Sequence, residues 1–255
     1  MQRILILGDL HAGSHVAPWP TSWLPGEPSH RISRYLTDCL AHLGANLEPI
    51  DLLILNGDLI DGPQRKSGGM GVFSPRLRDQ VSGAMELLAP IVAKASKTIR
   101  VEGTPYHDDD HDPLFALDER FGIKHVAQVF DLELPGGGIL NVAHHPGGGS
   151  TLYKGTKASR ELMQACLAAA RRKVPGTRWV VRSHLHHWLH HEEGGGTYVA
   201  VPCWQMPTAW SKKGNYWQWQ PDLGAALMLR DEDHPGGWRF RQIEYDVPMP
   251  EVTRL

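Results

Sequence analysis

Residues 4–11 of the chain read ILILGDLH: four apolar residues, a glycine, and then an Asp and a His two positions apart. A continuous apolar run of this kind predicts a strand that is buried on both faces. Asp9 and His11 follow at its exit, and in an extended segment side chains two positions apart point to the same side. The stretch therefore predicts a buried strand that presents a carboxylate and an imidazole together at its end.

Four further segments repeat this arrangement of an apolar run followed by an Asp or a His. Residues 51–55 lead to Asp58, residues 98–101 to the loop 103–107, residues 139–142 to His144, and residues 179–181 to His184 and His186. We expect these five strand ends to converge on one spot, because the ends of strands hold ligands more rigidly than loops do.

Each piece also has an ordinary explanation on its own. An Asp at a strand end is usually a turn former or a helix cap, and a His pair in a chain with 15 His is often surface decoration. Five strand exits that each carry such a residue are much harder to explain by chance. Carboxylate and imidazole groups are ligands for hard and borderline metal ions, so the combination favours a two-metal hydrolytic site.

The order of these motifs resembles that of the calcineurin-like metallophosphoesterases: Asp-x-His, Gly-Asp, Gly-Asn-His, His and Gly-His-x-His, which follows residues 8–186 here. The resemblance covers about three quarters of the chain. It implies a four-layer α/β/β/α fold of two mixed sheets, with a dinuclear centre at the strand ends. It implies one metal held by Asp9, His11, Asp58 and His186, and a second held by Asp58, His144 and His184. His107 would match the histidine that stabilises and protonates the leaving group.

The chain departs from that pattern in the third motif. Gly-Thr-Pro-Tyr-His at 103–107 stands where Gly-Asn-His is expected, so the family's amide ligand is missing. Thr104 could offer a hydroxyl instead, a water could fill the position, or His107 could have changed its role. Ser183 replaces a glycine before His184. His144 is preferred over His145 as a ligand because it lies nearer the strand end.

The ligand types indicate the chemistry and the metals. Two metal ions about 3.5–4 Å apart share a hydroxide that attacks phosphorus in line with the departing oxygen. Imidazole and oxygen ligands suit two divalent transition metal ions, with Mn preferred and Fe, Ni, Zn or Co as alternatives. His107 can act as a general acid if a neighbour keeps it protonated, and Asp108, or another acid of the run 108–110, is the candidate partner.

Composition agrees with a cytoplasmic enzyme of one domain. The 255 residues suffice for one α/β core, with the metal motifs at 8–187 and closing strands and Trp-rich loops at 196–246. We find no membrane-spanning run and no signal-like start, and three scattered cysteines suggest reduced thiols. The expected partner is a phosphoester substrate and not a membrane. The oligomeric state stays open.

The substrate is less clearly indicated. A net charge of −2 gives no overall basic field of the kind that marks general nucleic-acid binders. However, a Trp-rich insertion at 15–28, a basic one at 62–78 and a segment at 202–221 containing Lys212 and Lys213 would flank the site. Such walls favour nucleotide or nucleic-acid substrates, for a nuclease or a small-molecule esterase alike. The alternatives are a protein phosphatase and a degenerate module that binds metal or phosphate without turnover.

Helices are expected over 29–47 and 157–173, with a further apolar stripe from Leu77 to Val92 that includes Pro90. In the last quarter, residues 198–201 and 225–229 are expected to close the second sheet. Residues 238–245 alternate in polarity as an edge strand does.

Overall fold

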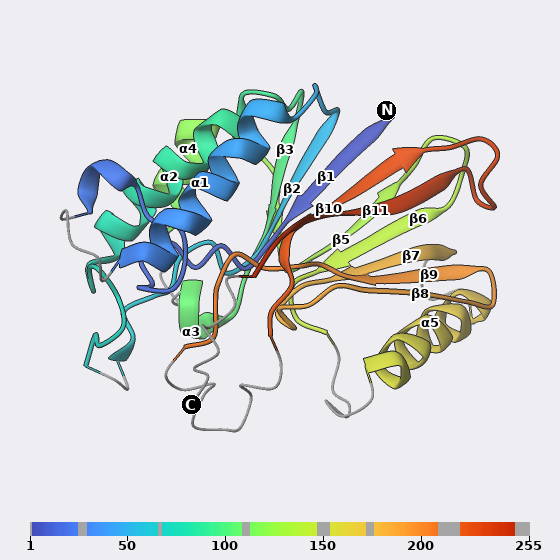
Figure 1. The fold of residues 1–255 in the computed structure, drawn as a ribbon. Coiled ribbons are helices and arrows are strands. Elements are labelled where there is room, and N and C mark those ends of the chain that lie inside the picture. The colour runs from blue at the N-terminus through green and yellow to red at the C-terminus, as the bar shows by residue number, and fades with distance from the viewer. Residues whose placement is uncertain are drawn as a thin grey trace, which may run out of the picture.

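The computed structural model describes residues 2–24, 30–65, 68–108, 113–146, 154–171, 176–208 and 220–247. Two β-sheets pack face to face, and helices cover the outer face of each sheet (Figure 1). This is the four-layer α/β/β/α arrangement of two mixed sheets that the sequence predicted. None of the helices in these ranges is both long and apolar enough to cross a membrane.

The first sheet has the strand order β11-β10-β1-β2-β3-β4. Four strands are parallel: β1 (Arg3–Leu7), β2 (Leu52–Asn56), β3 (Thr98–Val101) and β4 (Val126–Ala127). Two strands run antiparallel to their neighbours: β10 (Leu223–Arg230), which pairs with β1, and β11 (Trp238–Tyr245), which lies at the edge. The expectation that residues 225–229 belong to the second sheet was therefore wrong, whereas the edge position of 238–245 is confirmed.

The second sheet has the order β5-β6-β7-β9-β8. Its strands are β5 (Val129–Glu133), β6 (Ile139–Ala143), β7 (Thr177–Arg182), β8 (Leu189–Glu193) and β9 (Gly196–Ala200). The central strands β6, β7 and β9 are parallel, and the two outer strands are antiparallel to them.

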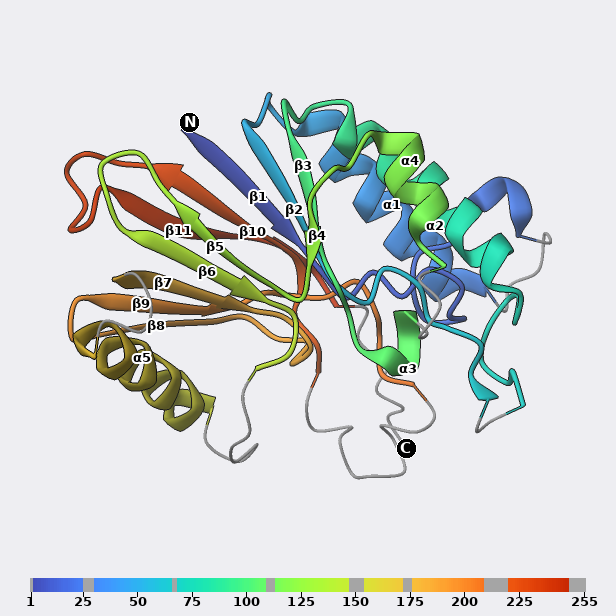
Figure 2. The same ribbon diagram turned by 180° about the vertical axis from the view of Figure 1, so that it is seen from behind.

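Three helices cover the first sheet and one covers the second (Figure 2). The three are α1 (Arg31–Asn46), α2 (Leu77–Val92) and α4 (Phe115–Phe121), and the fourth is α5 (Lys154–Ala170). Two short turns, η1 (Thr21–Trp23) and α3 (Pro105–Asp108), lie in the loops that follow β1 and β3. The predicted helix ends agree within a few residues, and residues 172–173 lie outside the described ranges.

The strand β1 shows why a continuous apolar run was required. Ile4 and Ile6 pack between the two sheets, against Val142 and Val181 among others. The alternate residues of β1 face the helix layer instead. Both faces of the strand are thus covered by apolar side chains, and the loop at its carboxyl end is fixed to a rigid support.

Most of the described tryptophans belong to the packing. Trp179, Trp204 and Trp238 are fully buried, and Trp19 is nearly so. The Nε1 of Trp238 donates a hydrogen bond to the Pro135 carbonyl at 3.2 Å. The remaining part of the predicted aromatic and basic wall, with Trp210, Lys212, Lys213, Trp217 and Trp219, lies outside the described residues.

Candidate metal centre

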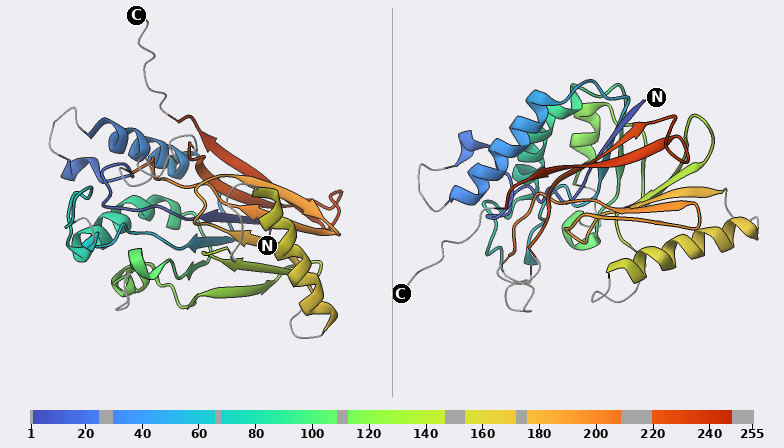
Figure 3. Two further views of the ribbon diagram at one scale, coloured as in Figure 1. Left: turned by 90° about the horizontal axis from the view of Figure 1, so that it is seen from below. Right: turned by 45° about the vertical axis from the view of Figure 1, so that its right-hand side comes forward.

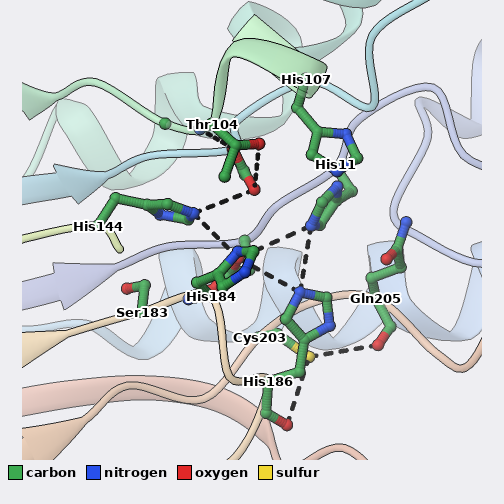
Figure 4. Close-up of polar contacts among 12 residues, drawn as sticks. His11, Thr104, His107, His144, Ser183, His184, His186, Cys203 and Gln205 are labelled. Carbon is green, nitrogen blue, oxygen red and sulfur yellow. Dashed lines mark hydrogen bonds and ion pairs between the residues drawn. The ribbon is translucent and has the colours of Figure 1, made fainter. Parts of the chain in front are cut away.

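The carboxyl ends of β1, β2, β3, β6 and β7 meet at one edge of the sandwich, as expected from the sequence. All six predicted ligands lie there within two compact groups, Asp9 with His11 and His186, and Asp58 with His144 and His184. In each group, three potential ligand atoms lie within 4.8 Å of one another. Figure 4 shows the imidazoles pointing toward a common centre from loops that are far apart in the sequence.

The backbone at these ligands is unusual. Five of the six have a positive φ: Asp9 (50°), His11 (49°), Asp58 (49°), His184 (68°) and His186 (56°). Such values are uncommon for residues other than glycine and persist only where the surrounding structure enforces them. The expectation that Asp9 and His11 share a side because the segment is extended was therefore wrong. Their side chains meet because two left-handed residues wind the loop around the centre.

Hydrogen bonds between neighbouring loops hold this conformation. The Asp9 N–H donates to the Gly57 carbonyl at 3.1 Å, and the His11 N–H donates to the Asp58 carbonyl at 3.0 Å. The exits of β1 and β2 are thus cross-linked through their main chains. Gly57 has a φ of 76°, and a Cβ there would collide with the His144 ring. A glycine is required at this position by both its conformation and the close approach of His144.

The first group brings ring nitrogens against each other and against a carboxylate. The Nε2 atoms of His11 and His186 are 3.3 Å apart. The Asp9 Oδ1 lies 3.3 Å from the His186 Nε2 and 3.7 Å from the His11 Nε2. Burial alone would raise the pKa of Asp9, but the imidazoles of His186 and His144 outweigh it and hold the pKa well below its usual value.

The second group has the same character and is joined to the first. The His144 Nε2 lies 3.1 Å from the Asp58 Oδ2 and 3.9 Å from the Asp9 Oδ1. Burial alone would lower the pKa of His144, but Asp58 and Asp9 outweigh it and raise the pKa to about 9. His145 is exposed, and its ring is tilted against that of His184, with 4.5 Å between the centroids. His144, not His145, is therefore the member of the group.

The donor set fits a divalent cation. The His144 Nδ1 lies 2.8 Å from the Asn56 carbonyl and donates its proton there, so in the neutral ring that a metal requires the Nε2 carries a lone pair that faces carboxylates. Neither this Nε2 nor the Asp9 Oδ1 has a hydrogen-bond partner among the described residues, although both atoms are buried. A lone pair that points at a carboxylate is repelled by it unless positive charge lies between them. A divalent metal ion held by these groups would supply that charge.

Thr104 stands where an amide ligand was missing, and its polar groups point to Asp58. The Thr104 N–H donates to the Asp58 Oδ1 at 2.6 Å, and the Thr104 Oγ1 lies 3.1 Å from the same oxygen. Thr104 thus fixes the orientation of the Asp58 carboxylate. Gly103 is tightly packed beside it, since a Cβ there would collide with Asp58 and Asp108.

His107 also lies at the centre, in a third group with His11 and Asp58. Its Nδ1 donates to the Asp61 carbonyl at 2.8 Å, and its ring meets that of His11 edge to face. The expected partner Asp108 turns away: its Oδ2 accepts a hydrogen bond from the Gly103 N–H at 2.6 Å. Burial and the charge of Asp58 raise the pKa of Asp108 to about 7. Asp109 and Asp110 lie outside the described residues.

Asp61 is a functional residue that the sequence reasoning left without a role. Its Oδ1 lies 3.2 Å from the His11 Nδ1 and accepts a hydrogen bond from the Gln205 Nε2 at 2.9 Å. Asp61 thereby supports both His11 and His107 from behind. Its place three residues after Asp58 was a signal that could have been used, whereas nothing in the sequence marked Gln205.

A second supporting pair lies behind the other group. The Asn56 Nδ2 donates to the Ser183 Oγ at 2.7 Å, while the Asn56 carbonyl holds His144. Ser183, which stands in place of an expected glycine, therefore links the exits of β2 and β7. The segment 203–205 closes the site from another side, since the Trp204 N–H donates to the Asp9 carbonyl at 3.0 Å.

The two predicted insertions contribute both buried and exposed side chains. Trp19 is buried and stacks on Phe73, 5.7 Å between ring centroids, so its role is packing. His15 is exposed and lies edge to face against Phe73 at 4.7 Å. Arg65, Arg76 and Arg78 are exposed, and Lys66 lies outside the described residues.

No protein-family model and no curated protein sequence matches this chain. Among solved structures, zinc-bound Vps29 from Entamoeba histolytica is 11% identical and has a TM-score of 0.44; the match covers 96% of this chain and 99% of that one. An archaeal phosphodiesterase is 10% identical with a TM-score of 0.47 (95% and 99% covered). The phosphoesterase Yfce from E. coli is 13% identical with a TM-score of 0.44 (90% and 89% covered).

These neighbours have the calcineurin-like metallophosphoesterase fold, the fold that the sequence motifs led us to expect.

Proposed function

We propose that this protein is a metal-dependent phosphoesterase that hydrolyses phosphodiester or phosphomonoester bonds. The observation that carries the proposal is the pair of Asp/His groups, joined by His144 and the two carboxylates of Asp9 and Asp58. Two adjacent cation sites at a strand edge match the requirements of phosphoryl transfer, in which charge develops on several oxygens at once.

The roles of the residues follow from their places. Asp9, His11 and His186 would hold one ion, His144 and His184 the other, and Asp58 would bridge the two. Divalent transition metal ions, with Mn as the first choice, would supply an activated water and neutralise charge on the phosphoryl group. The Asn56 carbonyl accepts from the His144 Nδ1 and so sets the tautomer of that ring. The Asp61 Oδ1 lies beside the His11 Nδ1 and orients the His11 ring.

Two roles for His107 can be separated by experiment. Its Nδ1 is bound to the Asp61 carbonyl, so the Nε2 is the nitrogen available to the site. As a general acid, it would protonate the departing oxygen, and a His107→Ala variant would lose more activity on alkyl esters than on nitrophenyl esters. If His107 instead replaces the missing amide as a metal ligand, the His107→Ala variant would hydrolyse both ester classes more slowly by the same factor. It would also require a higher metal concentration for activity.

Nucleotides or nucleic-acid ends are the proposed substrate class. His15, four residues beyond His11, presents an exposed ring beside Phe73, and the half-exposed Tyr106, next to His107, donates to the Gln64 Oε1 at 3.0 Å. Exposed rings beside a phosphate site can stack on bases, each stacked base contributing about 1–3 kcal/mol. A His15→Ala variant should lose activity on nucleotide diesters but not on bis-(p-nitrophenyl) phosphate.

The first test is hydrolysis of bis-(p-nitrophenyl) phosphate beside p-nitrophenyl phosphate, after Mn, Ni, Zn, Co or Mg is added back to chelated protein. Turnover that depends on metal, is lost in Asp58→Asn and is kept in the surface control Asp131→Asn would support the proposal. The preferred ester would separate a diesterase from a monoesterase. Absence of turnover with every metal, in folded protein that binds metal, would refute it.

The second candidate is a module that binds metal and phosphate without turnover. One observation favours it: Thr104 gives its hydroxyl and its N–H to Asp58, where an amide ligand was expected. This candidate predicts that Thr104→Asn creates or increases turnover by restoring the amide. The phosphoesterase proposal predicts measurable turnover in the wild-type chain.

A further inference from the structure

A turn and an outer strand meet at the end of the sandwich opposite the candidate metal centre (Figure 1). The turn between β10 and β11 belongs to the first sheet, and β8 is the outer strand of the second sheet; the two lie side by side in the left panel of Figure 3. Glu192 of β8 lies near both His190 of the same strand and His234 of the turn. The Glu192 Oε1 lies 3.2 Å from the His190 Nε2 and 3.8 Å from the His234 Nε2.

The tautomer of His234 makes this contact informative. Its Nδ1 lies 2.9 Å from the carbonyl of Pro235 and donates its proton there. In the neutral ring, the Nε2 therefore carries a lone pair that points toward the Glu192 carboxylate. Two groups of this kind repel each other unless positive charge lies between them, either a second proton on His234 or a metal ion. At metal sites, a ligating histidine usually donates the N–H of its other ring nitrogen to a carboxylate, a backbone carbonyl or water.

The turn holds His234 firmly. The His234 N–H donates to the Asp231 carbonyl at 3.2 Å, and the Gly237 N–H donates to the His234 carbonyl at 2.7 Å. Gly236 packs so closely on Arg178 of β7 that a Cβ there would lie 2.8 Å from the guanidinium Nε. One ligand is thus positioned by the first sheet while resting on the second.

The two ligands on β8 are positioned by the pleat of the strand. His190 and Glu192 are two residues apart and share one face, while His191 and Glu193 share the other. On that other face, the His191 Nε2 lies 3.0 Å from the Ser159 Oγ of α5 and 3.3 Å from the Glu193 Oε2. The sequence His-His-Glu-Glu therefore splits into a pair that faces His234 and a pair that faces α5.

We propose that His190, Glu192 and His234 form a further binding site for a borderline divalent transition metal ion such as Zn²⁺. Two imidazoles and one carboxylate are a common zinc donor set. The three side chains are 35%, 52% and 27% exposed, so they have room to turn inward to bonding distance and leave one position for water. The ion would fasten the β10–β11 turn to β8 and so join the two sheets. The inference is independent of the proposed activity.

The test is the zinc content of untagged protein after equilibrium dialysis against Zn²⁺, followed by metal analysis. We expect His234→Ala to bind one zinc ion fewer per chain than the wild type. His191→Ala is the matched control, because it removes a histidine from the same strand but from the opposite face, and it should keep the wild-type content. Equal zinc in wild type and His234→Ala would overturn the proposal, and so would an equal loss in both variants, which would indicate adventitious binding to surface histidines.

A second measurement locates the ion and checks that the variant is folded. Zinc should slow amide hydrogen exchange at residues 231–237 in the wild type and in His191→Ala, but not in His234→Ala. Exchange in β1 and β2 should be the same in all three proteins, which would show that the fold is intact. Zinc that leaves the exchange of 231–237 unchanged in the wild type would overturn the proposal whatever the stoichiometry.

Discussion

Replacing Asp61 by Asn tests whether this buried carboxylate supports the metal centre. The variant keeps the size of the side chain and leaves in place the backbone carbonyl that accepts from His107. It removes the negative charge that lies 3.2 Å from the His11 Nδ1. Asp61 is only 3% exposed, so water cannot replace the lost charge.

The magnitude follows from the contacts of the two carboxylate oxygens. One oxygen faces His11 and Gln205, and the other accepts from the Gln64 Nε2 at 2.9 Å. An Asn can keep only one of these oxygens as an acceptor. Hydrogen bonds to a charged group contribute about 1.5–3 kcal/mol and neutral ones about 1 kcal/mol. A loss of about 1–2 kcal/mol in metal binding corresponds to roughly 5–30-fold weaker affinity, near the lower end of the range seen when partners of metal ligands are removed.

The assay is the rate of bis-(p-nitrophenyl) phosphate hydrolysis as a function of Mn concentration, with Mn binding measured directly by calorimetry. The half-saturating Mn concentration should rise roughly 5–30-fold, within the range given above. The rate at saturating Mn should fall less, because the anchor of His107 is unchanged. An Asp131→Asn variant, altered at an exposed carboxylate of β5, serves as the control. An Asp61→Asn protein with the Mn affinity of the wild type would refute the role given to Asp61.

Three further outcomes are expected. His144→Ala should abolish metal-dependent hydrolysis, whereas His145→Ala should retain most of it, because only His144 faces Asp58; equal losses would contradict the assignment. Gly57→Ala should abolish activity, because the new Cβ would collide with the His144 ring. Gly122→Ala is the control: its φ of 65° is similar, but no described atom lies within 4 Å of the new Cβ. It should cost only about 1 kcal/mol of stability in urea unfolding and leave activity intact. Two backbone N–H groups at the start of β1 donate to the Asp51 carboxylate and lower its pKa. The ionised carboxylate therefore stabilises the fold at pH values above its pKa in the unfolded chain. This stabilisation is lost as the pH falls through the lower pKa of the folded chain. Asp51→Asn should therefore be less stable than the wild type by about 1 kcal/mol near neutral pH, and the difference should shrink at about pH 3.

The backbone conformation of the ligand loops could not be predicted from the local sequence. The residues after β1 were expected to be extended, but Asp9 and His11 adopt a left-handed conformation that such residues rarely take. Main-chain hydrogen bonds to the loop after β2 enforce it. That loop is distant in the sequence, so no window around residue 9 contains the cause. The same holds for Gln205, which reaches Asp61 only because the chain returns to the site after β9.

The buried strands and the ligand types at their ends could be predicted from local sequence alone. A strand such as 4–7, apolar at every position, is stable only where both of its faces are covered. A carboxylate or an imidazole after each of five such strands is hard to explain by structural roles alone, so the set indicates metal ligands. Four features became visible only in the folded chain: β10 joins the first sheet, Thr104 holds Asp58, Asp61 supports His11, and His234 contacts β8. Each of these depends on pairing between segments far apart in the chain, and pairing is set by the packing of whole faces, which no local pattern specifies.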